Sequence, residues 1–283
     1  MNFLRKILFP VAFVYWIVTW IRNYFYDMQI FKSKSFDLPI IAVGNLSVGG
    51  TGKTPQIEYL IRLLQDQFNV ATLSRGYKRE TNDFVLANNS STVKEIGDEP
   101  FQFFTKFPKL KVAVDANRIN GINQLLRLDD TPDVILLDDA FQHRKVKAGF
   151  YILLTTYSEL FCDDFILPFG NLREPSSGKK RANMIIVTKC PTDISELAMC
   201  EIKEKLDVDV PVFFSKIEYD ELVYSEIKPI RTSDIKQAEK MKIEIEKLKD
   251  EYEKEKEEAK IQLNKKKYPV EKAFGSSKKY TKL

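Results

Sequence analysis

Residues 43–55 read VGNLSVGGTGKTP, and this stretch decides the fold class. The apolar run LPIIAVGNL (38–46) leads into it, and PQIEYLIRLLQDQF (55–68), which has helical spacing, follows it. A glycine-rich loop between a strand and a helix is the setting in which backbone N–H groups and a helix N-terminus bind phosphate groups. The stretch therefore predicts a phosphate-binding loop. The alternative, a glycine-rich turn with a chance GKT, would not explain the flanking elements.

The loop contains the core of the general phosphate-loop pattern but not all of it, because Ser47 stands where that pattern has glycine. Its glycines allow the backbone to approach a ligand closely. Lys53 is expected to reach the terminal phosphates, and Thr54 to offer its hydroxyl to Mg²⁺. The residues predicted to hold the nucleotide are Ser47, Val48, Gly49, Gly50, Thr51, Gly52, Lys53 and Thr54.

A second motif, DVILLDDA (133–140), is an apolar run that ends in two carboxylates. Phosphoryl-transfer enzymes of this fold class hold Mg²⁺ from the end of such a strand. Because side chains alternate along a strand, one of Asp138 and Asp139 is expected to face the metal and the other to hold a water or a neighbour. The two motifs predict a nucleoside triphosphate and Mg²⁺ as ligands. They leave the phosphoryl acceptor open, and a polar strand end at the sheet edge is the alternative for the second motif.

Beyond these motifs, short apolar runs alternate with helical segments such as SELAMCEIKEKL (195–206). The further runs are NVATLSR (69–75), KVAVDA (111–116), YILLTT (151–156), NMIIVTK (183–189) and PVFFSKI (211–217). Apolar runs without polar alternation are typical of strands buried on both faces. The pattern predicts an α/β fold of the phosphate-loop type, with a mainly parallel sheet covered by helices.

The amino-acid composition argues against several classes of protein. The hydrophobic share of 44% rules out wholesale disorder, and 283 residues suffice for two domains or one large α/β domain. The 44 Lys+Arg against 40 Asp+Glu leave a net charge of +4, so no nucleic-acid partner is predicted. Three cysteines without a CxxC pair, and a single histidine, predict neither a zinc site nor a disulfide framework.

The N-terminal run ILFPVAFVYWIVTWI (7–21) is short for a spanning helix, which needs about 20 apolar residues. Trp16 and Trp20 are side chains that favour the lipid headgroup region, and flanking basic residues such as Arg22 suit anionic lipids. We predict a monotopic membrane-associated helix within residues 1–30. An ordinary buried helix that caps the sheet is the alternative.

From about Arg231 the sequence is strongly charged and helix-favouring. A thin heptad track allows a marginal coiled coil, so self-association through residues 236–262 is predicted, with a solvated single helix as the alternative. The chain is accordingly divided into a membrane-associated helix (1–30), a phosphate-loop core (31–230) and a charged helical or disordered tail (231–283).

Several blocks in order resemble the tetraacyldisaccharide 4′-kinase family over roughly residues 1–230. The blocks are VGNLSVGGTGKTP (43–55), SRGYKR (74–79), GDEP (97–100), DANR (115–118), LLDDAFQHR (136–144), LPFGNLREP (167–175) and VTKCP (187–191). The resemblance implies a kinase that uses ATP and Mg²⁺ to phosphorylate the 4′-hydroxyl of a tetraacyldisaccharide 1-phosphate in lipid A (lipopolysaccharide) synthesis. It also implies the cytoplasmic face of a bacterial inner membrane as the location.

The resemblance further implies a catalytic role for Asp98, which matches a family carboxylate that acts on the acceptor hydroxyl. A turn or N-cap aspartate is the alternative for it. Glu174 matches a carboxylate near the metal. The predicted metal ligands are Thr54, Asp138 and Glu174, and the predicted catalytic residues are Asp98, Lys53, Asp138 and Asp139.

The acceptor already carries a phosphate, which cationic side chains must position. The resemblance implies this role for Arg75, Arg118 and Arg173, with surface salt bridges as the alternative. For His143, also counted among the substrate-binding residues, it implies a hydrogen-bonding role on the acceptor side or behind a neighbouring residue, with a structural histidine as the alternative. By analogy, Lys189 is expected on the nucleotide-base side.

The family pattern continues with a DHH-type block, whose histidine partners the carboxylate at Asp98, and with a TEKD-type block. Neither is present here, since the one histidine, His143, belongs to LLDDAFQHR. We therefore predict a kinase with reduced or absent turnover in this form. The alternatives are an inactive nucleotide-binding scaffold that oligomerises through its tail, and a partitioning-type ATPase. The latter usually has an early loop lysine where this chain has Val48.

Overall fold

The computed structural model describes residue 5 and residues 7–77, 79–80 and 83–217, with the backbone of two short strands further along the chain. The chain divides into two compact units, Met1–Glu218 and Tyr219–Leu283. In the second unit, β9 (Leu222–Val223) and β10 (Ile230–Arg231) pair antiparallel. The tail predictions, including self-association through 236–262, lie outside the described residues.

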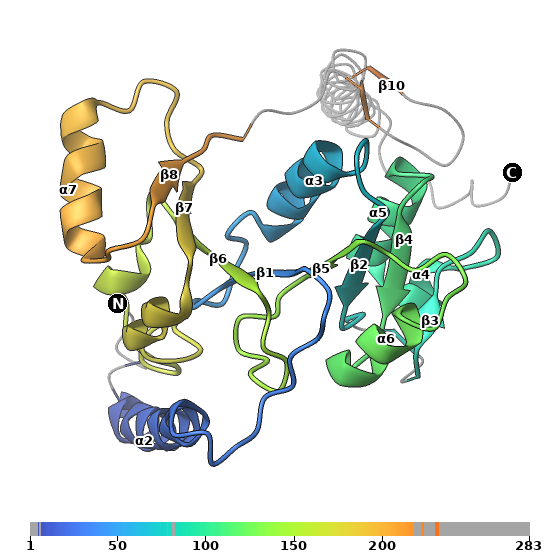
Figure 1. Ribbon diagram of the computed structural model, residues 1–283. Coiled ribbons are helices and arrows are strands. Elements are labelled where there is room, and N and C mark those ends of the chain that lie inside the picture. The colour runs from blue at the N-terminus through green and yellow to red at the C-terminus, as the bar shows by residue number, and fades with distance from the viewer. Residues whose placement is uncertain are drawn as a thin grey trace, which may run out of the picture. The chain divides into compact units, whose positions relative to one another are not determined.

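The first unit is built on an eight-stranded sheet of order β3-β4-β2-β5-β1-β6-β7-β8 (Figure 1). The strands are β1 (Ile40–Asn45), β2 (Val70–Ser74), β3 (Val85–Leu86), β4 (Lys111–Val114), β5 (Val134–Leu137), β6 (Phe150–Thr156), β7 (Met184–Thr188) and β8 (Val212–Phe214). All neighbours are parallel except β3 and β4. The predicted mainly parallel α/β fold is confirmed. Strand β3 was not predicted, because a strand of this length leaves no periodicity to detect.

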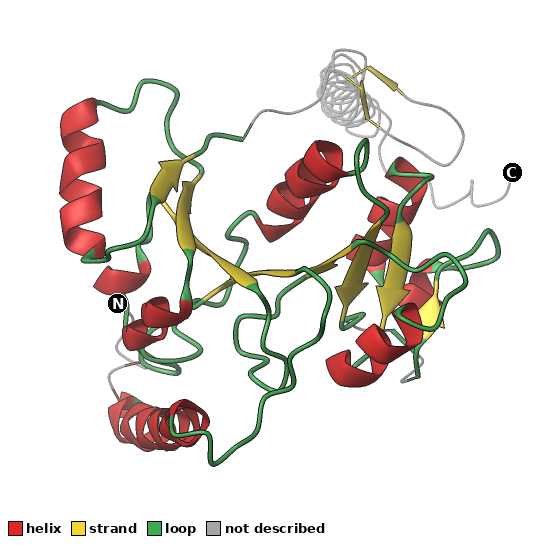
Figure 2. Cartoon of the chain, viewed as in Figure 1, coloured by secondary structure: helices red, strands yellow, loops and turns green. Residues whose placement is uncertain are grey.

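Helices cover both faces of this sheet (Figure 2). They are α3 (Lys53–Leu64), α4 (Val93–Ile96), α5 (Asp98–Lys106), α6 (Arg118–Leu125) and α7 (Glu196–Leu206). Successive strand residues point to opposite faces. Leu136 of β5 thus belongs to the core cluster that holds α3 and α5, whereas its neighbours Ile135 and Leu137 belong to the cluster that holds α6. Burial on both faces explains why the strands read as continuous apolar runs.

The N-terminal helix, α2 (Phe9–Asp27), extends beyond the predicted apolar run. Its one fully buried residue is Ala12, and large apolar side chains along it are exposed. Phe13, Trp16, Trp20 and Tyr24 form a ladder of stacked rings. This exposure does not fit an ordinary buried helix. Within the described part of the chain, we find no helix that is both long and apolar enough to cross a membrane.

Candidate functional site

The phosphate loop connects the end of β1 to the start of α3. Gly52 is the N-cap of α3 and has a left-handed backbone (φ +83°), a conformation that glycine adopts without strain. Lys53 is the first residue of α3, so the loop lies at the positive end of the helix dipole. The predicted order of strand, glycine-rich loop and helix is therefore present.

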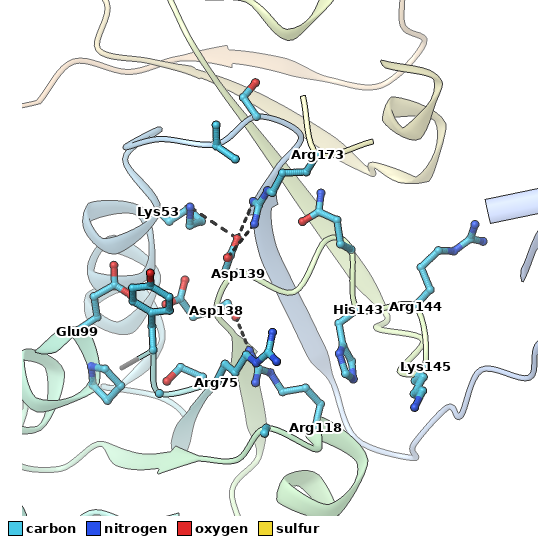
Figure 3. Close-up of a pocket in the computed structure, with 18 of the residues that line it drawn as sticks. Lys53, Arg75, Glu99, Arg118, Asp138, Asp139, His143, Arg144, Lys145 and Arg173 are labelled. Carbon is cyan, nitrogen blue, oxygen red and sulfur yellow. Dashed lines mark hydrogen bonds and ion pairs between the residues drawn. The ribbon is translucent and has the colours of Figure 1, made fainter. Parts of the chain in front are cut away.

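Asp139 is the centre of an ion-pair cluster beside the loop (Figure 3). Arg173 donates to both carboxylate oxygens, from Nη2 at 2.8 Å and from Nη1 at 3.0 Å, and Lys53 Nζ lies 3.6 Å from Oδ1. Burial tends to raise the pKa of Asp139, but the hydrogen bond and charge of Arg173, with the charge of Lys53, hold that pKa below its usual value. Asp139 is thus a carboxylate held in its ionised form.

Asp138 lies beside Asp139 in a different environment. It is 2% exposed, and its Oδ1 has no hydrogen-bond partner among the described residues. Burial, followed by the negative charges of Glu99 and Asp139, raises the pKa of Asp138 to about 7. The expectation that the two carboxylates alternate along a regular strand is wrong, because β5 ends at Leu137 and Asp139 has a left-handed backbone (φ +46°).

Glu99 brings a further carboxylate to this end of the site. It stands in the first turn of α5, and Thr54 Oγ1 donates to its Oε1 at 3.3 Å. Its effect on the pKa of Asp138 shows that the two carboxylates are close. Thr54, Asp138 and Glu99 therefore gather hard oxygen atoms next to the phosphate loop. Sequence analysis missed Glu99, although the GDEP block in which it stands was available as a signal.

His143 lies within a group of cations on the other side of the close-up (Figure 3). Burial, followed by the positive charges of Arg118, Lys145, Arg22 and Arg75, lowers the pKa of His143 to about 4. Its Nε2 is buried and has no hydrogen-bond partner in the described part of the chain. We call the four cations, together with the neutral His143 that they surround, the cation cluster. Such a group of positive charges favours an anionic ligand.

Arg118 is the buried member of the cation cluster. It donates from Nη1 to the backbone oxygen of Asp115 at 2.8 Å and from Nη2 to that of Asp138 at 3.1 Å. Burial lowers the pKa of Arg118 to about 10, so the side chain stays positively charged at neutral pH. It therefore places a fixed charge directly behind the carboxylate pair.

One cavity of about 860 Å³ joins these parts. The predicted site residues that line it are Ser47, Val48, Gly49, Lys53, Arg75, Asp98, Arg118, Asp138, Asp139, His143 and Arg173. The lining residues that sequence analysis did not assign to the site include Arg22, Tyr26, Glu99, Arg144 and Lys145. Of these, Arg22 and Tyr26 come from α2, and no local pattern connects them with the phosphate loop. A Cβ built on Gly50 would lie 3.9 Å from Lys189 Nζ, which places that lysine against the loop.

Glu174 does not line this cavity. It is 2% exposed, and its carboxylate accepts three hydrogen bonds. Oε1 accepts from Gln142 Nε2 at 2.9 Å and from Arg181 Nη2 at 2.7 Å, and Oε2 accepts from Asn23 Nδ2 at 2.9 Å. The metal role expected for Glu174 stays a prediction.

The chain is similar to one family of kinases. A family model described as LpxK, tetraacyldisaccharide-1-P 4′-kinase, matches residues 4–255, which is beyond residue 230, where the resemblance was expected to stop. The tetraacyldisaccharide 4′-kinase of Flavobacterium psychrophilum is 62% identical over 245 residues, which are 85% of this chain and 71% of that protein. The kinase of the same name from Flavobacterium johnsoniae is 60% identical over 243 residues, covering 85% of this chain and 72% of that protein.

A solved structure agrees with the sequence comparisons. The crystal structure of the "apo" form of LpxK from Aquifex aeolicus, in complex with ATP, superimposes with a TM-score of 0.72 and 34% sequence identity. The match covers 82% of this chain and 71% of that chain.

Proposed function

Because the chain belongs to the tetraacyldisaccharide-1-P 4′-kinase family, we propose that it transfers the terminal phosphoryl group of ATP to the 4′-hydroxyl of a tetraacyldisaccharide 1-phosphate. This reaction is a step of lipid A synthesis. The observation that carries the proposal is one cavity in which the phosphate loop, a pair of carboxylates and a cluster of cations meet. Phosphoryl transfer depends mainly on positioning and on charge stabilisation, and this cavity offers groups for both.

On the nucleotide side, the backbone of residues 47–52 would hold the phosphates of ATP, and Lys53 would place its charge on the terminal ones. Lys53 Nζ now lies 3.4 Å from Asn45 Oδ1 and 3.6 Å from Asp139 Oδ1, so its side chain already points along the loop. Arg173 neutralises Asp139 in the same cluster and would contact phosphate oxygens.

The residues at the start of α3 and the end of β5 fit Mg²⁺. Among the described residues, no group of three or more His, Cys, Asp or Glu has a geometry that could hold a metal ion alone. Mg²⁺ is commonly bound by one or two carboxylates together with substrate phosphates. Thr54 and Asp138 would hold the ion, with Glu99 beside them, and the unpartnered Oδ1 of Asp138 is consistent with that role. When bound, the ion would neutralise charge on the β- and γ-phosphates.

On the acceptor side, Asp98 stands at the first position of α5 and lines the cavity. It would accept the proton of the attacking hydroxyl. Arg75, Arg118 and His143 of the cation cluster would hold the phosphate that the acceptor already carries. The family pattern places a histidine partner on this aspartate, whereas the one histidine of the given residues is His143, so we expect their turnover to be about 10²–10⁴-fold below that of a kinase with that partner.

The acceptor is a lipid, and α2 offers it a surface. Exposed apolar and aromatic side chains on α2 would bury in the headgroup region, and Arg22 and Tyr26 of the same helix line the cavity. We therefore propose peripheral, monotopic binding to the cytoplasmic face of a bacterial inner membrane. The substrate would then reach the cavity from the lipid surface.

Labelled ATP, Mg²⁺ and tetraacyldisaccharide 1-phosphate in mild detergent test the proposal. We expect labelled bis-phosphorylated lipid from the chain, and none from Lys53→Ala. Lys94→Ala is the matched control, because Lys94 is exposed and pairs only with Glu80 at 3.8 Å among the contacts described. ATP binding without product, even at high enzyme concentration, would contradict kinase activity and favour an inactive nucleotide-binding scaffold.

A further inference from the structure

The segment of residues 171–174 lies between the phosphate loop and α2, and it is hydrogen-bonded to both. Toward the loop, Arg173 N donates to Leu46 O at 2.7 Å and Val48 N donates to Asn171 O at 2.8 Å. Ser47 and Leu172 form an antiparallel bridge between these two bonds. The segment is thus a short strand partner of the loop that would hold the nucleotide phosphates.

Toward α2, the same segment is held at two points. Tyr15 Oη donates to Arg173 O at 2.8 Å, and Asn23 Nδ2 donates to Glu174 Oε2 at 2.9 Å. Tyr15 and Asn23 lie two turns apart on the helix, so α2 is fixed along its length rather than at one end. Arg5 Nη2, which precedes the helix, adds a bond of 3.2 Å to Asn171 Oδ1.

Glu174 is the buried point at which these contacts meet. Gln142, which donates to its Oε1, also donates from Nε2 to the backbone oxygen of Asn45 at 2.8 Å. Arg173, the residue before Glu174, donates to Asn45 and to both oxygens of Asp139. A carboxylate that is 2% exposed and fully hydrogen-bonded has no oxygen directed at the cavity.

We infer that Glu174 is a positioning residue: through the 171–174 segment it couples the placement of α2 to the geometry of the phosphate loop, Lys53 and Asp139. The inference rests on the proposed function, because the geometry that Glu174 would maintain is the one used in phosphoryl transfer. Binding of α2 to a lipid surface would thereby stabilise the arrangement that holds the nucleotide. The connection between α2 and the loop is stabilised by buried, charge-assisted hydrogen bonds to Glu174. Loss of one partner of such a bond leaves the other partner buried without a hydrogen bond.

Asn23→Asp is the direct test, because it places a second carboxylate against Glu174 at a position that does not itself line the cavity. The aspartate keeps an oxygen to accept the 3.4 Å hydrogen bond that Arg22 Nη1 now donates to Asn23 Oδ1. Misplacement by about 1 Å can cost about 10²-fold in rate, so we expect kcat to fall by about 10–100-fold. The Mg²⁺ concentration for half-maximal activity should stay unchanged. Hydrogen exchange of the amides of residues 46–50 should become faster. Thr19→Ala is the matched control on the same helix, because the hydrogen bonds of the Thr19 hydroxyl within the described part of the chain go to the Tyr15 and Trp16 carbonyl oxygens of α2.

A second substitution makes the test specific. In Asn23→Asp combined with Glu174→Gln, the amide nitrogen of the new glutamine can donate to the new aspartate while its oxygen still accepts from Arg181. Relative to Asn23→Asp alone, we expect this double variant to have a higher kcat and slower hydrogen exchange of the amides of residues 46–50. Simple damage to the fold would not produce such a recovery.

Two results would overturn the inference. One is wild-type kcat and exchange in Asn23→Asp. The other is a Glu174→Gln protein whose Mg²⁺ requirement rises by well over about 100-fold, beyond the 10–100-fold that loss of an outer hydrogen-bond partner costs, which would make Glu174 a metal ligand. If the wild-type chain makes no product at all, the kinase proposal fails, but the exchange measurement still decides whether Glu174 couples α2 to the loop.

Discussion

His143 is the residue whose charge the cavity controls most directly. Its pKa of about 4 means that the folded protein keeps the imidazole neutral at pH 5, where an unfolded chain, with an ordinary histidine pKa, would be protonated. Between about pH 4 and pH 6.5 the unfolded state therefore binds the extra proton, and the free energy of unfolding rises with pH across this window. Because the chain has one histidine, this titration can be measured without assignment.

We predict that His143→Gln removes this part of the pH dependence. We compare the free energy of unfolding of the variant minus that of the wild type at two pH values. This difference should be about 1–2 kcal/mol larger at pH 4.5 than at pH 7.5, after allowance for solvent screening of the partly exposed ring. Urea unfolding at both pH values measures the difference, and proton NMR of the imidazole measures the pKa directly. A titration midpoint near 6.5 would contradict the cation cluster as described.

The neighbouring carboxylates Asp138 and Asp139 are chemically identical, but their environments shift their pKa values in opposite directions. Asp139 is paired with Arg173 and Lys53 and has a lowered pKa, whereas Asp138 is buried near Glu99 and has a pKa raised to about 7. Adjacent positions in a sequence cannot reveal this difference, because it depends on burial and on charges contributed from α3, α5 and the 171–174 segment.

At the scale of elements, α2 carries a stripe of exposed apolar side chains. Val11, Val14 and Val18 are 55%, 59% and 57% exposed and lie on one stripe of the helix with Pro10 and Tyr15. Contiguous exposed apolar surface of this kind marks an interaction site.

We predict that Val14→Glu combined with Val18→Glu weakens binding to lipid vesicles by at least about 10-fold, because each substitution puts a charge into the exposed apolar stripe that we propose binds lipid. Vesicle co-sedimentation measures the binding. Leu63→Glu on α3, where Leu63 is 58% exposed, is the control for an added charge on exposed apolar surface. Kinase activity toward detergent-dispersed acceptor should be retained. Equal loss of vesicle binding in the control would argue against a specific role of α2.

At the scale of the whole molecule, the chain matches most but not all of the length of its relatives. Relatives such as the Flavobacterium psychrophilum kinase extend beyond the matched region, which covers 71% of that protein. The first unit, Met1–Glu218, contains the phosphate loop, the carboxylate pair and the cation cluster, so we expect ATP to bind to this unit.

We predict that fusing a family segment that carries the DHH-type block after residue 255, where the family match ends, raises kcat by about 10²–10⁴-fold, while the affinity for ATP changes little. The measurement is product formation and nucleotide binding in the original and fused chains. The same fusion with the histidine changed to alanine is the control. If the control gains as much as the fusion, the gain comes from folding or substrate binding and not from the histidine.

Much of the fold could be predicted from local patterns. The seven apolar runs became seven strands of the sheet, because strands buried on both faces must be apolar throughout. The phosphate loop was recognisable because its glycines and its lysine lie within one short stretch. The helices α4, α5 and α6 and the edge strand β3 were not predicted as elements, since each of them is short.

The amino-acid sequence by itself determined the phosphate loop, the parallel sheet and the membership of the chain in its kinase family, because each of these depends on residues that are neighbours in the chain. Only the tertiary structure decided that Glu99 joins Thr54 and Asp138, that Arg22 and Arg75 lie around His143, and that Glu174 faces α2 instead of the cavity. The physical reason is that these contacts join segments far apart in the chain. Their distances are set by how strand ends and helices pack, and no local pattern records them.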